Sequence, residues 1–185
     1  NDAMLLLGTP KLLTVGSQKT VRFDGSGGFL LTDTASLRLS TISIYAVVDM
    51  DANAQNQTII GNYAHVTGYA VGMSDGTPNA IKWFTSNKGN NSSTEPATLL
   101  PGDPDRYTIL NATYNSTLET EAAKTVYFDG LNVAREAGSG LAYSTSTVAT
   151  VGTVTLGGVQ NATGNVSEIL VYDSDSPAQY QAVHA

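Results

Sequence analysis

Short segments in which apolar and polar residues alternate recur along the chain, separated by Gly, Asp, Asn and Pro. The clearest is Thr41–Val48, TISIYAVV, whose Ile42, Ile44, Ala46 and Val48 would share one face of a strand. Roughly twelve such segments at near-regular spacing, with almost no helical periodicity, are typical of an all-β protein. The pattern predicts an antiparallel two-sheet β-sandwich of the jelly-roll type.

The length of the chain favours one domain. Residues 1–185 are enough for a single domain with a sizeable core. A short C-terminal helix is expected, because Ser174–Pro177 offers a capping residue followed by proline. The helical pattern is still running at Ala185, so we expect the domain to be cut from a longer protein. Residues 86–105 are polar and rich in Gly and Pro, which predicts a long loop.

Composition limits the partners. The formal net charge is -7, with only nine Lys and Arg residues, which argues against nucleic acid and anionic membrane surfaces. No apolar run approaches the roughly 20 residues that span a bilayer, so membrane insertion is not expected. The chain has no cysteine, which excludes disulfides and thiolate chemistry.

The last alternating segment, Asn165–Tyr172, carries a glutamate in its middle. Strict alternation places Glu168 on the same face as Val166, Leu170 and Tyr172. The second half of the segment is apolar on both faces, which is typical of a buried central strand. We therefore expect Glu168 to be held by nearby hydrogen-bond donors.

Asn-x-Ser/Thr triplets, the acceptor sequence for N-glycans, are frequent in the chain. They begin at Asn56, Asn90, Asn91, Asn111, Asn115, Asn161 and Asn165. In a secreted eukaryotic protein they would carry glycans on surface loops, whereas in a Ser/Thr/Asn-rich bacterial surface protein they mean nothing. We favour the second interpretation, because Asn111 and Asn165 fall within strand patterns.

Several stretches, taken in order, resemble one family of sandwich domains. They are Val21–Gly25 (VRFDG), Phe29–Leu31, Thr41–Val48, Tyr107–Tyr114, the hairpin Val126–Ala134 (VYFDGLNVA) and Leu156–Tyr172. Together they cover nearly the whole chain and resemble the laminin-G-like domains of the concanavalin-A-like lectin/glucanase superfamily.

That resemblance implies a structural role for Glu168. In the family, the last strand pairs with the strand after the early FDG turn, so Glu168 would accept hydrogen bonds near Phe23–Gly25. Ser167 stands where the family often has an aspartate, which weakens any inference of a metal there. Family members include polysaccharide-binding modules, adhesion domains and outer domains of secreted enzymes, so we expect an extracellular or cell-surface location.

The residues that catalysis needs do not form a pattern. Polysaccharide-cleaving enzymes of this fold resemble one another in a Glu-x-Asp-x-x-Glu strand with paired carboxylates. Glu119-Thr120-Glu121 lacks the central aspartate, and His65 and His184 lie in an expected loop and in the expected terminal helix. We therefore predict that the chain is not an enzyme.

One acidic turn resembles the start of a calcium loop. Asp49-Met50-Asp51-Ala52-Asn53 matches D-x-D-x-N. The loop then departs from the pattern, with Ala54 in place of glycine and Ile60 in place of the bidentate glutamate. Asp49 and Asp51 are the candidate metal ligands, and calcium in a structural role is the cofactor to consider.

Sugar binding needs aromatic faces and planar polar groups. Trp83 alternates with Phe84 in a strand pattern, and we expect Trp83 to face the core. The outward candidates, which could line the exposed face of one sheet, are Tyr45, Lys82, Phe84, Tyr107 and Asn111. A loop-edge site built from Tyr63, His65 and Asn87–Asn91 is the alternative.

These patterns favour a non-catalytic, lectin-like carbohydrate-binding module whose partner is a polysaccharide or glycan. The alternative is a protein-adhesion or structural domain that binds other extracellular proteins and no glycan. An exposed strip of aromatic and amide groups would favour the glycan, whereas a broad apolar patch would favour a protein partner. A hydrolase or lyase is the third interpretation.

Overall fold

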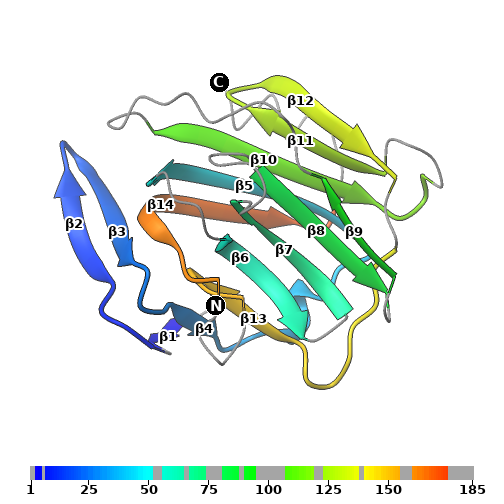
Figure 1. Cartoon of the computed structure of the whole chain (residues 1–185), viewed down its shortest axis with the longest axis horizontal. Coiled ribbons are helices and arrows are strands. Elements are labelled where there is room, and N and C mark those ends of the chain that lie inside the picture. Colours follow the sequence, from blue (N-terminus) through cyan, green and yellow to red (C-terminus); the bar gives the residue numbers. More distant parts are fainter. Residues whose placement is uncertain are drawn as a thin grey trace.

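The computed structural model describes residues 3–5, 7–51, 56–64, 67–73, 81–87, 90–94, 107–118, 123–137, 140–154 and 160–174. These residues form two seven-stranded antiparallel sheets packed face to face (Figure 1). Their only helix is a single 3-10 turn, Ala35–Leu37, and none is long and apolar enough to cross a membrane. The predicted sandwich is confirmed, while residues 175–185 of the expected C-terminal helix lie outside the described residues.

The chain crosses between the two sheets several times. The first sheet consists, in spatial order, of β1 (Ala3–Leu5), β4 (Phe29–Leu31), β13 (Val148–Val151), β6 (Gln57–Ala64), β7 (Thr67–Met73), β8 (Ile81–Asn87) and β9 (Asn90–Thr94). The second consists of β12 (Leu131–Glu136), β11 (Lys124–Phe128), β10 (Thr108–Asn115), β5 (Thr41–Met50), β14 (Thr163–Tyr172), β3 (Gln18–Asp24) and β2 (Lys11–Val15). Strands β6 to β9 all lie in the first sheet, while β10 to β12 all lie in the second. The long loop predicted for residues 86–105 is partly wrong, because β9 pairs with β8.

The core lies between the inner faces of the two sheets. Ile42, Ile44, Ala46 and Val48 of β5 are buried together, as their alternation predicts. Trp83 of β8 is fully buried and donates its indole Nε1–H to the backbone oxygen of Thr113, 2.8 Å away in the opposite sheet. The prediction that Trp83 faces the core is confirmed, and its hydrogen bond links the two layers.

The expectation for Glu168 is wrong, because a β-bulge interrupts β14. The pairing with β5 shifts register between Val166 and Glu168, so Ser167 is an extra residue. Val166 is buried and Ile169 packs against the core, whereas Glu168 is exposed on the other face. A bulge changes which face the following residues occupy, and an unbroken apolar pattern gives no sign of it.

The partner of the last strand also differs from the expectation. β14 pairs with β3, which contains the VRFD sequence, and not with β4, the strand after the turn. Asp24 and Phe23 lie opposite Thr163 and Gly164, at the start of β14. Glu168 is therefore well beyond Phe23–Gly25, where hydrogen bonds to it were expected.

Candidate functional site

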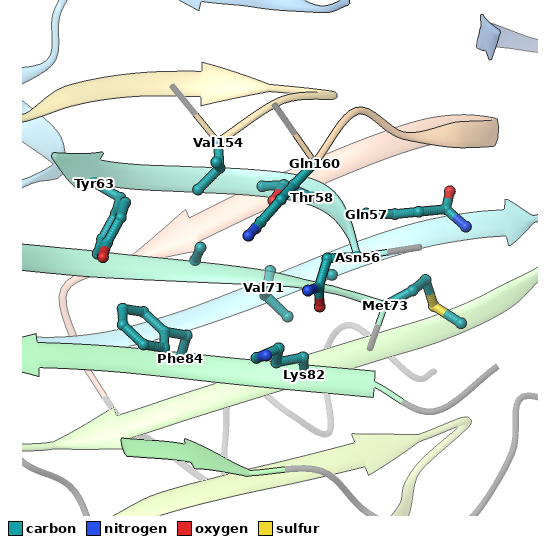
Figure 2. Close-up of a pocket in the computed structure, with 12 residues that line it drawn as sticks. Asn56, Gln57, Thr58, Tyr63, Val71, Met73, Lys82, Phe84, Val154 and Gln160 are labelled. Carbon is teal, nitrogen blue, oxygen red and sulfur yellow. The ribbon is translucent and has the colours of Figure 1, made fainter. Parts of the chain in front are cut away.

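A pocket opens on the outer face of the first sheet, over β6, β7 and β8 (Figure 2). In β8, Lys82 and Phe84 alternate with the buried Ile81 and Trp83, so their side chains point away from the core. The pocket has a volume of about 110 Å³. This is small beside the roughly 300–1,000 Å³ of sites that enclose a drug-sized ligand.

The floor of the pocket is formed by small residues, Ala70 and Gly72 of β7. At Gly72 a Cβ atom would lie 1.7 Å from the backbone oxygen of Gln57, so the close approach of β6 and β7 requires glycine. No side chain therefore rises from the middle of this surface at Gly72, and the larger side chains stand around it.

An aromatic pair lies at one end of the pocket (Figure 2). The rings of Tyr63 and Phe84 meet edge to face, with centroids 5.1 Å apart and an interplanar angle of 84°. Both side chains are half-buried. Burial raises the pKa of the Tyr63 hydroxyl, which remains a neutral donor and acceptor at ordinary pH.

Amide and ammonium groups line another part of the pocket. Figure 2 shows Lys82, Asn56 and Gln160 beyond the aromatic pair. Gln160 has a φ of 55°, a conformation that is uncommon for a residue other than glycine. Its backbone oxygen accepts a hydrogen bond from Thr58 N, 2.8 Å away, which holds Gln160 against β6.

Gln57 also lines the pocket, but its amide is used within the fold. Its Nε2 donates to the backbone oxygen of Asp51 at 3.1 Å, and its Oε1 accepts from Thr163 N at 2.6 Å. Gln57 is 2% exposed. Its role is to join β6 to β14.

The structure does not bring the five predicted ligand-binding residues together. Lys82 and Phe84 lie in the pocket, whereas Tyr45, Tyr107 and Asn111 lie on or beside the second sheet. The expectation of one shared exposed face is wrong, because alternation assigns a side chain to a face without assigning its strand to a sheet.

Two of the three residues on the second sheet are buried. Tyr45 is 3% exposed and packs edge to face on Tyr172, with ring centroids 5.8 Å apart. Asn111 is 0% exposed and donates its Nδ2–H to the backbone oxygen of Ile44, 3.0 Å away. Burial also closes Asn111 to glycosylation in the folded protein. Tyr107 is half-buried, and its hydroxyl lies 3.3 Å from Thr20 Oγ1.

Asn56 stands out in the sequence only as the start of an Asn-x-Thr triplet, and Gln160 belongs to no motif. Both lie outside the strands, so alternation says nothing about them. Tyr63, proposed for a loop-edge site, lies in β6 and reaches the same pocket as Phe84. His65 of that alternative site is outside the described residues, as are Glu119, Glu121 and His184.

The carboxylates of Asp49 and Asp51, the predicted metal ligands, both accept hydrogen bonds from other side chains. Both carboxylate oxygens of Asp51 accept hydrogen bonds from the Arg22 guanidinium, one at 2.9 Å. Asp49 Oδ2 accepts from Asn165 Nδ2 at 2.9 Å. Within the described ranges no group of three or more His, Cys, Asp or Glu could hold a metal ion. The calcium site stays a prediction.

No family model matches the sequence, and no curated protein matches it significantly. The fold is nevertheless similar to solved structures. One is domain 4 of AbnA, a GH43 extracellular arabinanase from Geobacillus stearothermophilus, solved in complex with arabinotriose. The match covers 96% of this chain and 82% of the arabinanase domain, with a TM-score of 0.70 and 13% sequence identity. Another is the CBM40 module of the Ruminococcus gnavus IT-sialidase, bound to α2,3-sialyllactose. The match covers 98% of this chain and 100% of the CBM40 module, with a TM-score of 0.65 and 9% sequence identity.

A structure of botulinum neurotoxin type C is also similar; entry of this toxin into cells depends on interaction with two ganglioside molecules. It matches 99% of this chain with a TM-score of 0.66 and 10% identity, and this chain spans 45% of its length. At such identities the likeness establishes a shared β-sandwich fold. These structural neighbours are carbohydrate-binding domains, and the chain is similar to them in architecture.

Proposed function

We propose that this chain is a non-catalytic, lectin-like carbohydrate-binding module of a secreted or cell-surface multidomain protein, related to laminin-G-like and concanavalin-A-like domains. The observation that carries the proposal is the pocket on the first sheet. It joins the aromatic pair Tyr63–Phe84 to the amides of Asn56 and Gln160 and the ammonium of Lys82.

The chemistry of these groups suits a sugar ring. One face of a pyranose or furanose is a row of C–H groups that can stack on Phe84, while its hydroxyls need planar donors and acceptors such as amides. At about 110 Å³ the pocket takes part of one ring and leaves the rest in solvent.

The structural neighbours support the same class of ligand. The arabinanase domain and the sialidase module were solved with arabinotriose and α2,3-sialyllactose. We therefore propose a polysaccharide or glycan as the partner of this chain, without choosing among sugars.

The proposal is tested by affinity electrophoresis in gels that contain arabinan, galactan, xylan or β-glucan, and by calorimetry with arabinotriose and sialyllactose. At least one ligand should bind, and Phe84→Ala should weaken binding about tenfold, or about 1.4 kcal/mol, through lost ring stacking. Leu131→Ala, on an exposed leucine of β12, is the control and should bind as the wild type does. No retention on any of these ligands would overturn the proposal.

The same experiments with a chelator test the calcium prediction. Binding that disappears with chelator and returns with calcium would indicate a calcium site, with Asp49 and Asp51 as the ligands to substitute first. Binding that is unchanged by the chelator would mean that the pocket binds the glycan without calcium.

One observation favours the alternative of a protein partner. Large apolar side chains near the N-terminus are exposed, with Met4 at 55%, Leu5 at 60% and Leu12 at 71%. Met4 and Leu5 belong to β1 of the first sheet and Leu12 to β2 of the second, and exposed apolar side chains can mark interaction surfaces. If no glycan binds, these side chains make a protein-adhesion or structural role the better interpretation.

A further inference from the structure

A second and larger hollow lies on the opposite face of the sandwich, beside the second sheet. Its volume is about 710 Å³, within the range of roughly 300–1,000 Å³ that holds small ligands. The turn of the β2–β3 hairpin, from Val15 to Lys19, forms one wall and Tyr107 the other. Val47 of β5 and Glu168 of β14 form the floor. We call this hollow the hairpin groove.

The hairpin groove exists because the sheet curls at this edge. β3 and β10 are separated by β5 and β14, so in a flat sheet they would lie about 14 Å apart at ~4.8 Å per strand. That gap exceeds what a tyrosine and a threonine side chain span together. Tyr107 nevertheless lies within hydrogen-bond distance of Thr20, with 3.3 Å between their side-chain oxygens. The hairpin, seen at one side in Figure 1, therefore bends over the outer face.

The bulge in β14 places Glu168 in this groove. Regular alternation would carry Glu168 into the core with Val166, but the extra residue Ser167 moves it to the outer face. Bulges are frequent next to binding and active sites, where they redirect one side chain. Glu168 is exposed and shares the groove with the Tyr107 ring and the amide of Gln18.

The lining determines the class of ligand. Its charged residues in the described chain are Lys19 and Glu168, one of each sign, which favours a neutral molecule. Ser17, Gln18 and Ser167 add hydroxyl and amide groups, while Val15, Val47 and Tyr107 add apolar surface. Of the floor strands, β5 is paired on both sides, and β14 pairs with β3 only from Thr163 to Val166.

We infer that the hairpin groove is a second binding site, for a short segment of a neutral oligosaccharide. The Glu168 carboxylate accepts hydrogen bonds from neighbouring sugar hydroxyls, Gln18 supplies a planar amide, and the Tyr107 ring covers a C–H face. The inference takes its ligand class from the proposed function and adds a site on the other face, which would make the module bivalent.

Backbone amide NMR with arabinotriose, maltotriose and cellotriose tests the inference. We expect shifts in residues 15–19 and 167–168 with at least one trisaccharide. They should persist in Phe84→Ala, which alters only the pocket. Glu168→Gln, close in shape to the exposed glutamate, should weaken binding in the groove at least tenfold. Asp173→Asn removes another exposed carboxylate of the same chain segment and should have no effect.

The outcomes separate the two proposals. Shifts confined to the pocket, with unchanged binding by Glu168→Gln, would overturn the second site and leave glycan binding in place. Equal losses in Glu168→Gln and Asp173→Asn would also overturn it, because a general loss of negative charge would then explain both. No shifts with any trisaccharide would overturn the second site, and failure on the polysaccharide gels as well would overturn the proposed function.

Discussion

At the scale of single residues, Asp24 anchors the segment before β2. Its carboxylate accepts hydrogen bonds from Thr9 Oγ1 at 2.7 Å, Ser26 N at 3.0 Å and the Ser26 hydroxyl. These bonds, the Ser26 hydroxyl first, lower the pKa of Asp24 from 3.8 to about 2. A carboxyl whose pKa is lower in the folded state stabilises that state above about pH 4 and loses the effect as the pH falls through 2.

An NMR titration of Asp24 should therefore give a midpoint near pH 2, with Thr9 and Ser26 amide shifts that follow it. Asp24→Asn should abolish these shifts, whereas Asp33→Asn, at another turn, should leave them in place. A midpoint near the ordinary value of 3.8 would show that the three hydrogen bonds do not persist in solution.

The candidate site shows how far single-residue patterns reach. Alternation with Trp83 correctly placed Lys82 and Phe84 away from the core. The same argument placed Tyr45 and Asn111 on the outer side, yet both are buried, because exposure on an outer face depends on what packs over it. Gln160 entered the site through a turn conformation that no periodicity describes.

At the scale of elements, local turn chemistry was a reliable guide and the bulge was not. Asp129 and Gly130 have φ values of 43° and 88° and join β11 to β12, as the Asp-Gly pair predicts. Ser167 carries no such mark. One extra residue reverses the faces of all the residues that follow it. The prediction that Glu168, Leu170 and Tyr172 share the face of Val166 was therefore wrong for all three residues.

Deleting Ser167 should consequently be tolerated. The ladder between β14 and β5 becomes regular while Ile169 keeps its place on the core side, so we expect the free energy of unfolding to change by less than about 1 kcal/mol. Deleting Leu170 moves Val171 to the outer face and should cost at least about 2 kcal/mol. Urea unfolding measures both. Equal losses would mean that Ser167 is not the extra residue of a bulge.

At the scale of the whole molecule, the order of strands was beyond reach of the sequence. Alternation identifies the buried face of a strand, but the alternating pattern looks the same whichever sheet the strand belongs to. The sheet partition places β8 and its Phe84 opposite β5 and β10, which is why the predicted ligand residues divided. The same partition leaves β2 at the edge of the second sheet, with Leu12 71% and Leu13 38% exposed.

An exposed apolar edge strand presents unpaired backbone groups to a second copy of itself. Antiparallel pairing of β2 about Leu13 would bring Lys11 of one copy opposite Val15 of the other, so no like charges would meet. We therefore expect concentration-dependent dimers in analytical ultracentrifugation. Leu13→Lys places like charges at the centre of the pairing and should weaken the dimer at least tenfold, or about 1.4 kcal/mol. Leu131→Lys, on the other edge strand at 72% exposure, is the matched control. An equal effect of Leu131→Lys would show that the dimer contact is not at β2. A monomer at every concentration would contradict the predicted pairing of β2 with a second copy.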